Sequence, residues 1–157
     1  MRTLRMLMVP VAFSGGLSSL ALADDGSVTF AELDSLLASA GQHDVTAYEE
    51  IAVKDGGRIE MQGWRDDGWQ LDVESLQRDG SLTREAQQRS DIPTWSLAGG
   101  DVEQTLNVAR RSGLQRFESL DVDASGHLDI EDYDNQRREI ELRLDGSDFS
   151  TIGVDNA

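Results

Sequence analysis

The chain has 157 residues, no cysteine, and 30 Asp and Glu against 14 Lys and Arg, which gives a formal net charge of −16. This composition excludes a disulfide scaffold, and the negative charge repels nucleic acid and anionic lipid while it attracts cations and basic protein surfaces. The length suits one compact domain or two very small ones.

The first residues have the pattern of a secretory signal peptide. Arg2 and Arg5 precede an uncharged stretch, 6–22, and the small-residue sequence Ala-Leu-Ala at 21–23 is the kind that signal peptidase recognises. Glycine and serine make the stretch a poor membrane-spanning helix, which needs about 20 strongly apolar residues. We therefore expect cleavage of residues 1–23 and a periplasmic or secreted protein that does not insert into the membrane. Because the two arginines leave, 12 basic residues remain against 30 acidic ones, a net charge of −18.

A helix and several strands are predicted after the cleavage point. Thr29 and Glu32 have the spacing of a capping box, and apolar residues follow at helical spacing up to Gly41. Apolar and polar residues then alternate around Ile51/Val53, Ile59/Met61 and Trp69/Leu71/Val73, which is typical of strands with one buried face. Asp and Gly at 55–57, 66–68 and 79–80 predict turns between and after these strands.

The chain repeats itself at an offset of 69 residues, since 48–73 aligns with 117–142 without a gap. The matched apolar pairs include Tyr48 with Phe117, Ile51 with Leu120, Val53 with Val122, Ile59 with Leu128, Met61 with Ile130, Trp64 with Tyr133, Leu71 with Ile140 and Val73 with Leu142. A second helix is predicted between Asp101 and Gly113. Segment 89–100 has the composition of a linker, in which Trp95 is expected to pack against a sheet.

These elements predict an α+β fold of two tandem repeats, 24–88 and 101–157, each with one helix packed on a small antiparallel β-sheet. The order of the elements, with RIEM, DDG and WQLDV in the first copy and HLDIEDYDNQRREIELRLDG in the second, resembles the PepSY domain of exported bacterial proteins. The pairing is also similar to β-lactamase-inhibitor-like proteins, in which tandem copies present a concave sheet to an enzyme. The usual D-x-x-T-G ending of the family is replaced by Asp-Gly-Ser at 79–81 and 145–147.

The PepSY resemblance implies a binding protein without catalytic residues, one that regulates or inhibits a peptidase or another envelope protein. Trp64 and Trp69 are the candidate contacts for a protein partner, because tryptophan dominates interface hot spots. The expected partner is a basic protein or a peptidase. Of the three functions considered, an enzyme is the one that the sequence supports least. The chain has two histidines, His43 and His127, and none of the common nucleophile or phosphate-binding motifs.

Residues 121–132, DVDASGHLDIED, also match the twelve-residue EF-hand loop, with Gly126 at the sharp turn. The oxygen ligands would be Asp121, Asp123, Ser125, His127 through its carbonyl, Asp129 and Asp132. There is no second loop to pair with this one, and the first copy has Ala52, Lys54, Gly56 and Gly63 at four of the ligand positions. We therefore favour strand, turn and strand here. A calcium-binding EF-hand protein is the alternative function, with Ca²⁺ as its cofactor.

Overall fold

A computed structural model describes residues 26–54, 58–76 and 81–156. The predicted signal peptide, 1–23, and the turns predicted at 55–57 and 79–80 lie outside the described residues. Within the part of the chain that is described, no helix is long and apolar enough to span a membrane.

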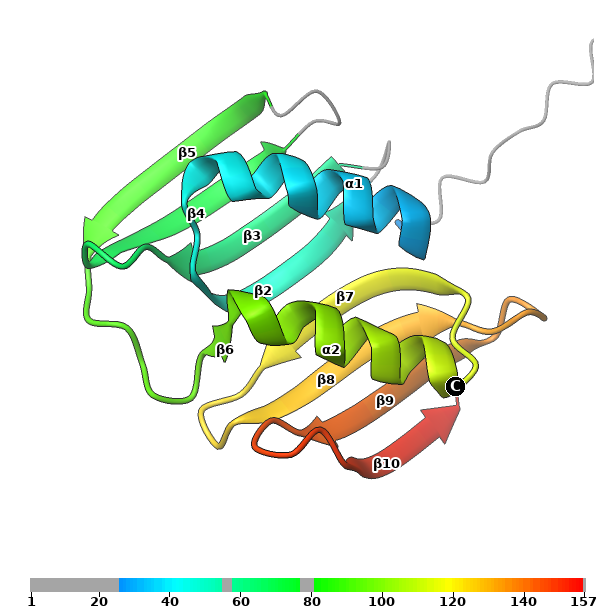
Figure 1. Ribbon diagram of the computed structural model, residues 1–157. Coiled ribbons are helices and arrows are strands. Elements are labelled where there is room, and N and C mark those ends of the chain that lie inside the picture. Colours follow the sequence, from blue (N-terminus) through cyan, green and yellow to red (C-terminus); the bar gives the residue numbers. More distant parts are fainter. Residues whose placement is uncertain (1–25, 55–57, 77–80, 157) are drawn as a thin grey trace, which may run out of the picture.

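The described chain forms a ten-stranded antiparallel sheet and two α-helices (Figure 1). The elements are β1 (Val28–Thr29), α1 (Phe30–Ala40), the 3-10 turn η1 (Gly41–His43), β2 (Ala47–Lys54), β3 (Arg58–Trp64), β4 (Trp69–Leu76), β5 (Leu82–Arg89), β6 (Leu97–Ala98), α2 (Gly99–Arg111), β7 (Arg116–Val122), β8 (His127–Tyr133), β9 (Glu139–Asp145) and β10 (Thr151–Asn156). The eight long strands follow the order β5-β4-β3-β2-β7-β8-β9-β10.

The predicted fold class, an α+β pair of tandem repeats that each place a helix on their own small sheet, is wrong because all the described strands belong to one sheet. β2 and β7 hydrogen-bond to each other in a register that places Ile51 opposite Leu120. The short strands cross over as well, since β1 pairs with β7 and β6 pairs with β2. Hydrophobic alternation indicates which face of a strand is buried. It does not indicate the neighbouring strand, because both edges of a strand offer the same backbone groups.

The 69-residue offset is visible in the strand pairing. β1, α1, β3 and β5 begin 69 residues before β6, α2, β8 and β10, respectively. The pair Val28↔Phe117 has its counterpart in Leu97↔Tyr48, and the counterparts Ile51 and Leu120 face each other. The sheet therefore has an approximate twofold axis between β2 and β7. We call β1–β5 the first half and β6–β10 the second half.

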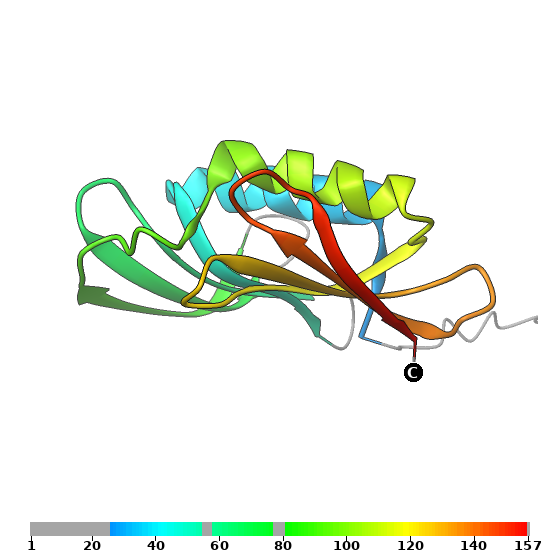
Figure 2. The same cartoon turned by 90° about the horizontal axis from the view of Figure 1, so that it is seen from below.

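Both helices lie on one face of the sheet and run antiparallel to each other (Figures 1 and 2). α1 begins at the predicted capping box, in which the Thr29 hydroxyl and the Glu32 carboxylate each accept the backbone N–H of the other residue. α2 begins at Gly99 rather than near Asp101, because β6 leads directly into it. A guanidinium N–H of Arg110 donates to Asp34 at 2.8 Å and joins the two helices.

The core lies between the helices and the sheet, and it includes Leu33, Leu36, Ile51, Met61, Leu71, Phe117, Leu120, Ile130 and Leu142. Neither helix covers the other side of the sheet (Figure 2). We call this side the open face. Its side chains alternate along each strand with those of the core, so the strand register determines which residues meet there.

Candidate functional site

Acidic side chains are aligned across the open face in two rows, because direct partners on antiparallel strands share a face. The first row runs from β4 to β9 through Asp72, Gln62, Glu50, Asp121, Asp129 and Arg143. The second row runs from β3 to β10 through Glu60, Ala52, Ser119, Glu131, Glu141 and Asp155. We call these the acidic rows. Most of their carboxylates were missed from sequence, although the same alternation that locates the core could have placed them.

Like charges are direct neighbours within each row. Glu50, Asp121 and Asp129 are consecutive in the first row. Directly opposed like charges on a sheet destabilise it, typically by about 0.2–1 kcal/mol. The pKa of Asp121 is raised, first by burial and then by the negative charges of Glu50 and Glu131. The fold therefore holds these carboxylates together although they repel each other.

Cations neutralise only the ends of this arrangement. Two guanidinium N–H groups of Arg143 donate to Asp129 at 2.6 and 2.7 Å. Lys54 Nζ lies 3.5 Å from a carboxylate oxygen of Glu60. Among the described residues, no Lys or Arg forms a salt bridge with the central carboxylates, Glu50, Asp121 and Glu131. The middle of the open face is thus the region where negative charge is least compensated.

The two tryptophans predicted to bind a partner do not share a face. Trp64 is only 2% exposed, and its ring packs edge-to-face on that of Trp95 with 5.8 Å between the centroids. The expectation that Trp95 packs against the sheet is confirmed. Trp69 lies on the helix-bearing side with Leu71, and the Arg89 guanidinium is 4.5 Å from the centre of its ring. Neither ring belongs to the acidic rows.

The central part of the EF-hand-like segment is a hairpin turn between β7 and β8. Asp123 organises the turn, because its Oδ1 accepts the backbone N–H groups of Ser125 at 2.7 Å and His127 at 3.1 Å. Its Oδ2 lies 3.4 Å from His127 Nδ1. Strands therefore stand where an EF-hand has helices.

The other predicted calcium ligands are divided between the two faces of this hairpin. Asp121 and Asp129 are opposite each other in the first acidic row, whereas Asp132 points to the helix-bearing side. Over the described ranges, no group of three or more His, Asp or Glu side chains is placed to hold a metal ion. The six residues thus do not converge on one point.

Asp132 is a fully buried carboxylate, at 0% exposure. One carboxylate oxygen accepts the backbone N–H of Tyr133, and Oδ2 has no hydrogen-bond partner among the described residues. Burial raises the pKa of Asp132 to about 7, although the backbone N–H groups of Tyr133 and Arg116 and the Arg116 guanidinium oppose this shift. The Asp132 carboxyl group therefore gains or loses its proton near neutral pH.

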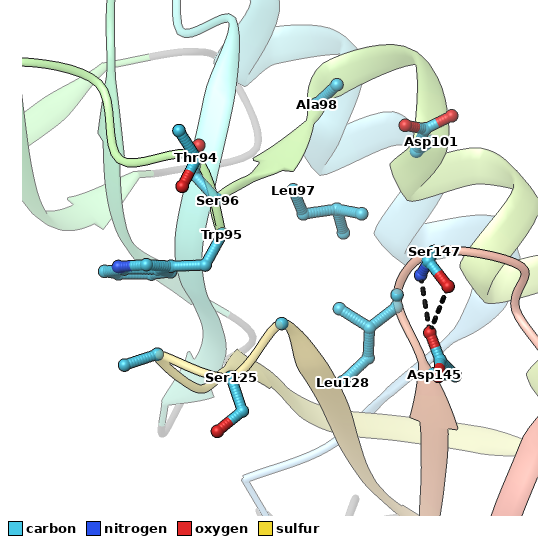
Figure 3. Close-up of a pocket in the computed structure, with 13 residues that line it drawn as sticks. Thr94, Trp95, Ser96, Leu97, Ala98, Asp101, Ser125, Leu128, Asp145 and Ser147 are labelled. Carbon is cyan, nitrogen blue, oxygen red and sulfur yellow. Dashed lines mark hydrogen bonds between the residues drawn. The ribbon is translucent and has the colours of Figure 1, made fainter.

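A polar cavity of about 400 Å³ lies where segment 94–98, the start of α2, the β7–β8 turn and the β9–β10 turn meet (Figure 3). Its polar groups are largely engaged. Ser147 donates its N–H and its hydroxyl to Asp145 Oδ1, at 2.8 and 2.6 Å, and the Ser96 hydroxyl donates to the Pro93 carbonyl at 2.7 Å. The Gly146 N–H also donates to the carbonyl of Gly126 at 3.0 Å. The last of these bonds joins the β9–β10 turn to the β7–β8 turn.

No family model matches the chain, and no curated protein matches its sequence. Among solved structures, the fold of this chain is similar to the crystal structure of a protein described as a putative lipoprotein from Clostridium difficile 630. The identity is 13%, the TM-score is 0.43, and the match covers 83% of this chain and 93% of the other. A likeness at this level carries no argument about function. The resemblance to PepSY domains remains a prediction from sequence.

Proposed function

We propose that this is an exported, non-enzymatic binding protein whose open face holds a basic segment of a protein partner. The like-charge contacts within the acidic rows carry this proposal. They lower the stability of the free protein, and a cationic partner would replace that repulsion with attraction. The predicted signal peptide supports a periplasmic or secreted location. The PepSY resemblance supports regulation or inhibition of a peptidase or another envelope protein.

The middle of the second row supports a basic partner in particular. Ala52 and Ser119 are direct neighbours there, and both are small. Glu50 and Asp121 lie beside them in the first row, and Glu131 follows Ser119 in the second. Ala52 and Ser119 are themselves buried, whereas Asp121 is exposed and Glu50 and Glu131 are partly exposed. A lysine or arginine side chain, whose long apolar stem lets its charged end reach past its neighbours, would therefore contact the carboxylates around this pair.

The test is calorimetric titration of the purified protein with decalysine at several salt concentrations. We expect binding that weakens steeply as salt is added, because exposed charges are screened over about 10 Å at 0.1 M salt. The triple variant Glu50→Gln/Asp121→Asn/Glu131→Gln should bind about tenfold more weakly, which corresponds to about 1.4 kcal/mol.

A matched control removes three exposed carboxylates outside the acidic rows, Asp44→Asn/Asp66→Asn/Glu103→Gln. It changes the net charge by the same amount and should bind nearly as tightly as the unmodified protein. Equal losses in the two triple variants would show that net charge, not the open face, governs binding. No binding of decalysine at low salt would refute the proposal. Saturable Ca²⁺ binding that Asp123→Asn abolishes would support the EF-hand alternative instead.

A further inference from the structure

The two outer edges of the sheet differ in chemistry. β5 forms one edge, and its exposed residues are Arg84, Glu85, Ala86, Gln87, Gln88 and Arg89. β10 forms the other edge, where Ile152 and Val154 are each 51% exposed. Edge strands offer unpaired backbone groups to other chains, and charged residues are the usual protection against such pairing. Charged residues protect both faces of β5. On β10 a charged residue protects one face, and the other face is apolar.

The register of β10 gives its two faces opposite characters. Val154 is the direct partner of Leu142 and therefore lies on the helix-bearing side. Asp155 is the direct partner of Glu141 and ends the second acidic row on the open face. A strand added beside β10 would meet an exposed apolar side chain on one face and a carboxylate on the other. Such a strand would need alternating apolar and basic residues.

We propose that an extended segment of the basic partner adds to the sheet as a strand beside β10. Its apolar side chains would lie next to Val154, and its Lys or Arg side chains would lie next to Asp155. This inference rests on the proposed function, because the second acidic row supplies the attraction. Charge favours this occupant over a second copy of the chain, which carries a net charge of −16. A second β10 would also bring its own Asp155 to an edge that is already acidic.

The experiment compares two synthetic peptides of the sequence Lys-Val-Lys-Val-Lys-Val-Lys on the purified protein. One peptide is unmodified, and the other is N-methylated at every residue, so that neither of its edges can donate backbone hydrogen bonds. We expect the methylated peptide to bind about tenfold more weakly, because main-chain bonds supply much of the affinity in strand addition. Hydrogen exchange should show added protection of the β10 amides with the unmodified peptide.

Protein variants locate the contact. Ile152→Thr/Val154→Thr keeps β-branched residues on the edge and removes exposed apolar surface, so we expect it to weaken binding of the unmodified peptide about fivefold to tenfold. The matched control is Ile92→Thr, because Ile92 is also an exposed apolar residue, at 41% exposure, but lies in the segment before β6. This substitution should leave the affinity unchanged. Circular dichroism checks that each variant is folded.

The outcomes separate this inference from the proposed function. If methylation and the β10 variant leave the affinity unchanged while the acidic-row triple variant lowers it, strand addition is wrong and the open-face proposal stands. If neither decalysine nor the alternating peptide binds, the proposed function itself fails. If the protein forms dimers that Ile152→Thr/Val154→Thr disrupts, the edge belongs to a second copy and the inference is overturned.

Discussion

The two halves of the sheet share a backbone arrangement but differ on the open face. Across the 69-residue offset, uncharged residues of the first half have acidic counterparts in the second. The pairs are Ala52 and Asp121, Gln62 and Glu131, Gln70 and Glu139, and Ala86 and Asp155. The core positions stay apolar in both halves, apart from Gly63 and its counterpart Asp132, because the same helix–sheet interface buries them. Open-face positions do not contribute to that burial. Glu50 and its counterpart Ser119 reverse the trend, but the second half is the more acidic one on this face.

The halves also differ at one position on the helix-bearing side, where Gly63 corresponds to Asp132. A Cβ added to Gly63 would lie 2.5 Å from the carbonyl oxygen of Ala47 and 2.7 Å from Val45 Cγ1. At the corresponding site of the second half the chain accommodates a carboxylate. The local packing is therefore not interchangeable, and three substitutions test how far the difference extends.

Gly63→Ala should have the largest effect. The added methyl group would contact a backbone carbonyl, which cannot move aside as a flexible side chain can, so we expect a loss of about 3 kcal/mol in the free energy of unfolding. Urea denaturation measures it. The control is Gly100→Ala in α2, where nothing lies within 4 Å of an added Cβ. That variant should change the stability by less than about 1 kcal/mol. Equal stability of the two variants would mean that the methyl group at position 63 is accommodated without strain, as the side chain of Asp132 is in the second half.

Asp132→Asn should have the next largest effect, and in the opposite direction. Because the pKa of Asp132 is raised to about 7 from an ordinary value of 3.8, the folded state binds this proton more tightly between these two pH values. The contribution to stability is therefore present at low pH and is lost as the pH rises toward 7. We expect Asp132→Asn to stabilise the protein by roughly 2 kcal/mol at pH 8 and to change little at pH 4.

Denaturation at pH 4, 6 and 8 checks this prediction against Asp134→Asn. The backbone N–H of Arg138 leads the groups that lower the pKa of Asp134, so this contribution to stability is present near neutral pH and is lost in acid. Asp134→Asn should therefore destabilise the protein at pH 8. If Asp132→Asn keeps the pH dependence of the unmodified protein, the buried carboxylate is not what distinguishes the second half.

Asp121→Asn should have the smallest effect. It removes a charge that faces Glu50 and Asp129 directly, so we expect stabilisation by about 0.5 kcal/mol at low salt. The gain should disappear at high salt, because exposed charges are screened. Thermal unfolding at two salt concentrations measures it, with Asp44→Asn as a control for net charge. A destabilised variant would show that Asp121 contributes to folding and would weaken the case for a binding surface.

Much of the secondary structure could be predicted from local patterns. The capping box at Thr29 and the alternation around Ile51, Ile59 and Leu71 each depend on residues close in sequence, and the structure contains the corresponding helix and strands. The single sheet could not be predicted in this way, because the β2–β7 pairing joins residues far apart in the sequence, such as Ile51 and Leu120. The acidic rows follow only from the cross-strand register.

The residues of the two predicted sites do not lie together, for related physical reasons. Trp64 becomes buried because Trp95, distant in sequence, packs on its ring. Asp132 follows Leu128 and Ile130 at every second position of β8 and therefore lies on the same buried face, which the strand pattern predicts. The EF-hand interpretation of the same residues does not predict this burial, because it assigns each residue a role from its position in a loop and not from the strand face on which it lies.

The crossed pairing of the short strands has a consequence for the order in which the chain folds. β6 and β7 pair with the same edge of β2, so this edge is fully paired only after the chain has been synthesised through Asp121. Contacts between residues so far apart form slowly, because a long loop must close before they contribute any stability. An unpaired edge beside apolar side chains is also prone to aggregation during that interval. The β2–β7 pair therefore makes the two halves one cooperative folding unit, because the inner edge of each half is paired only by strands of the other half.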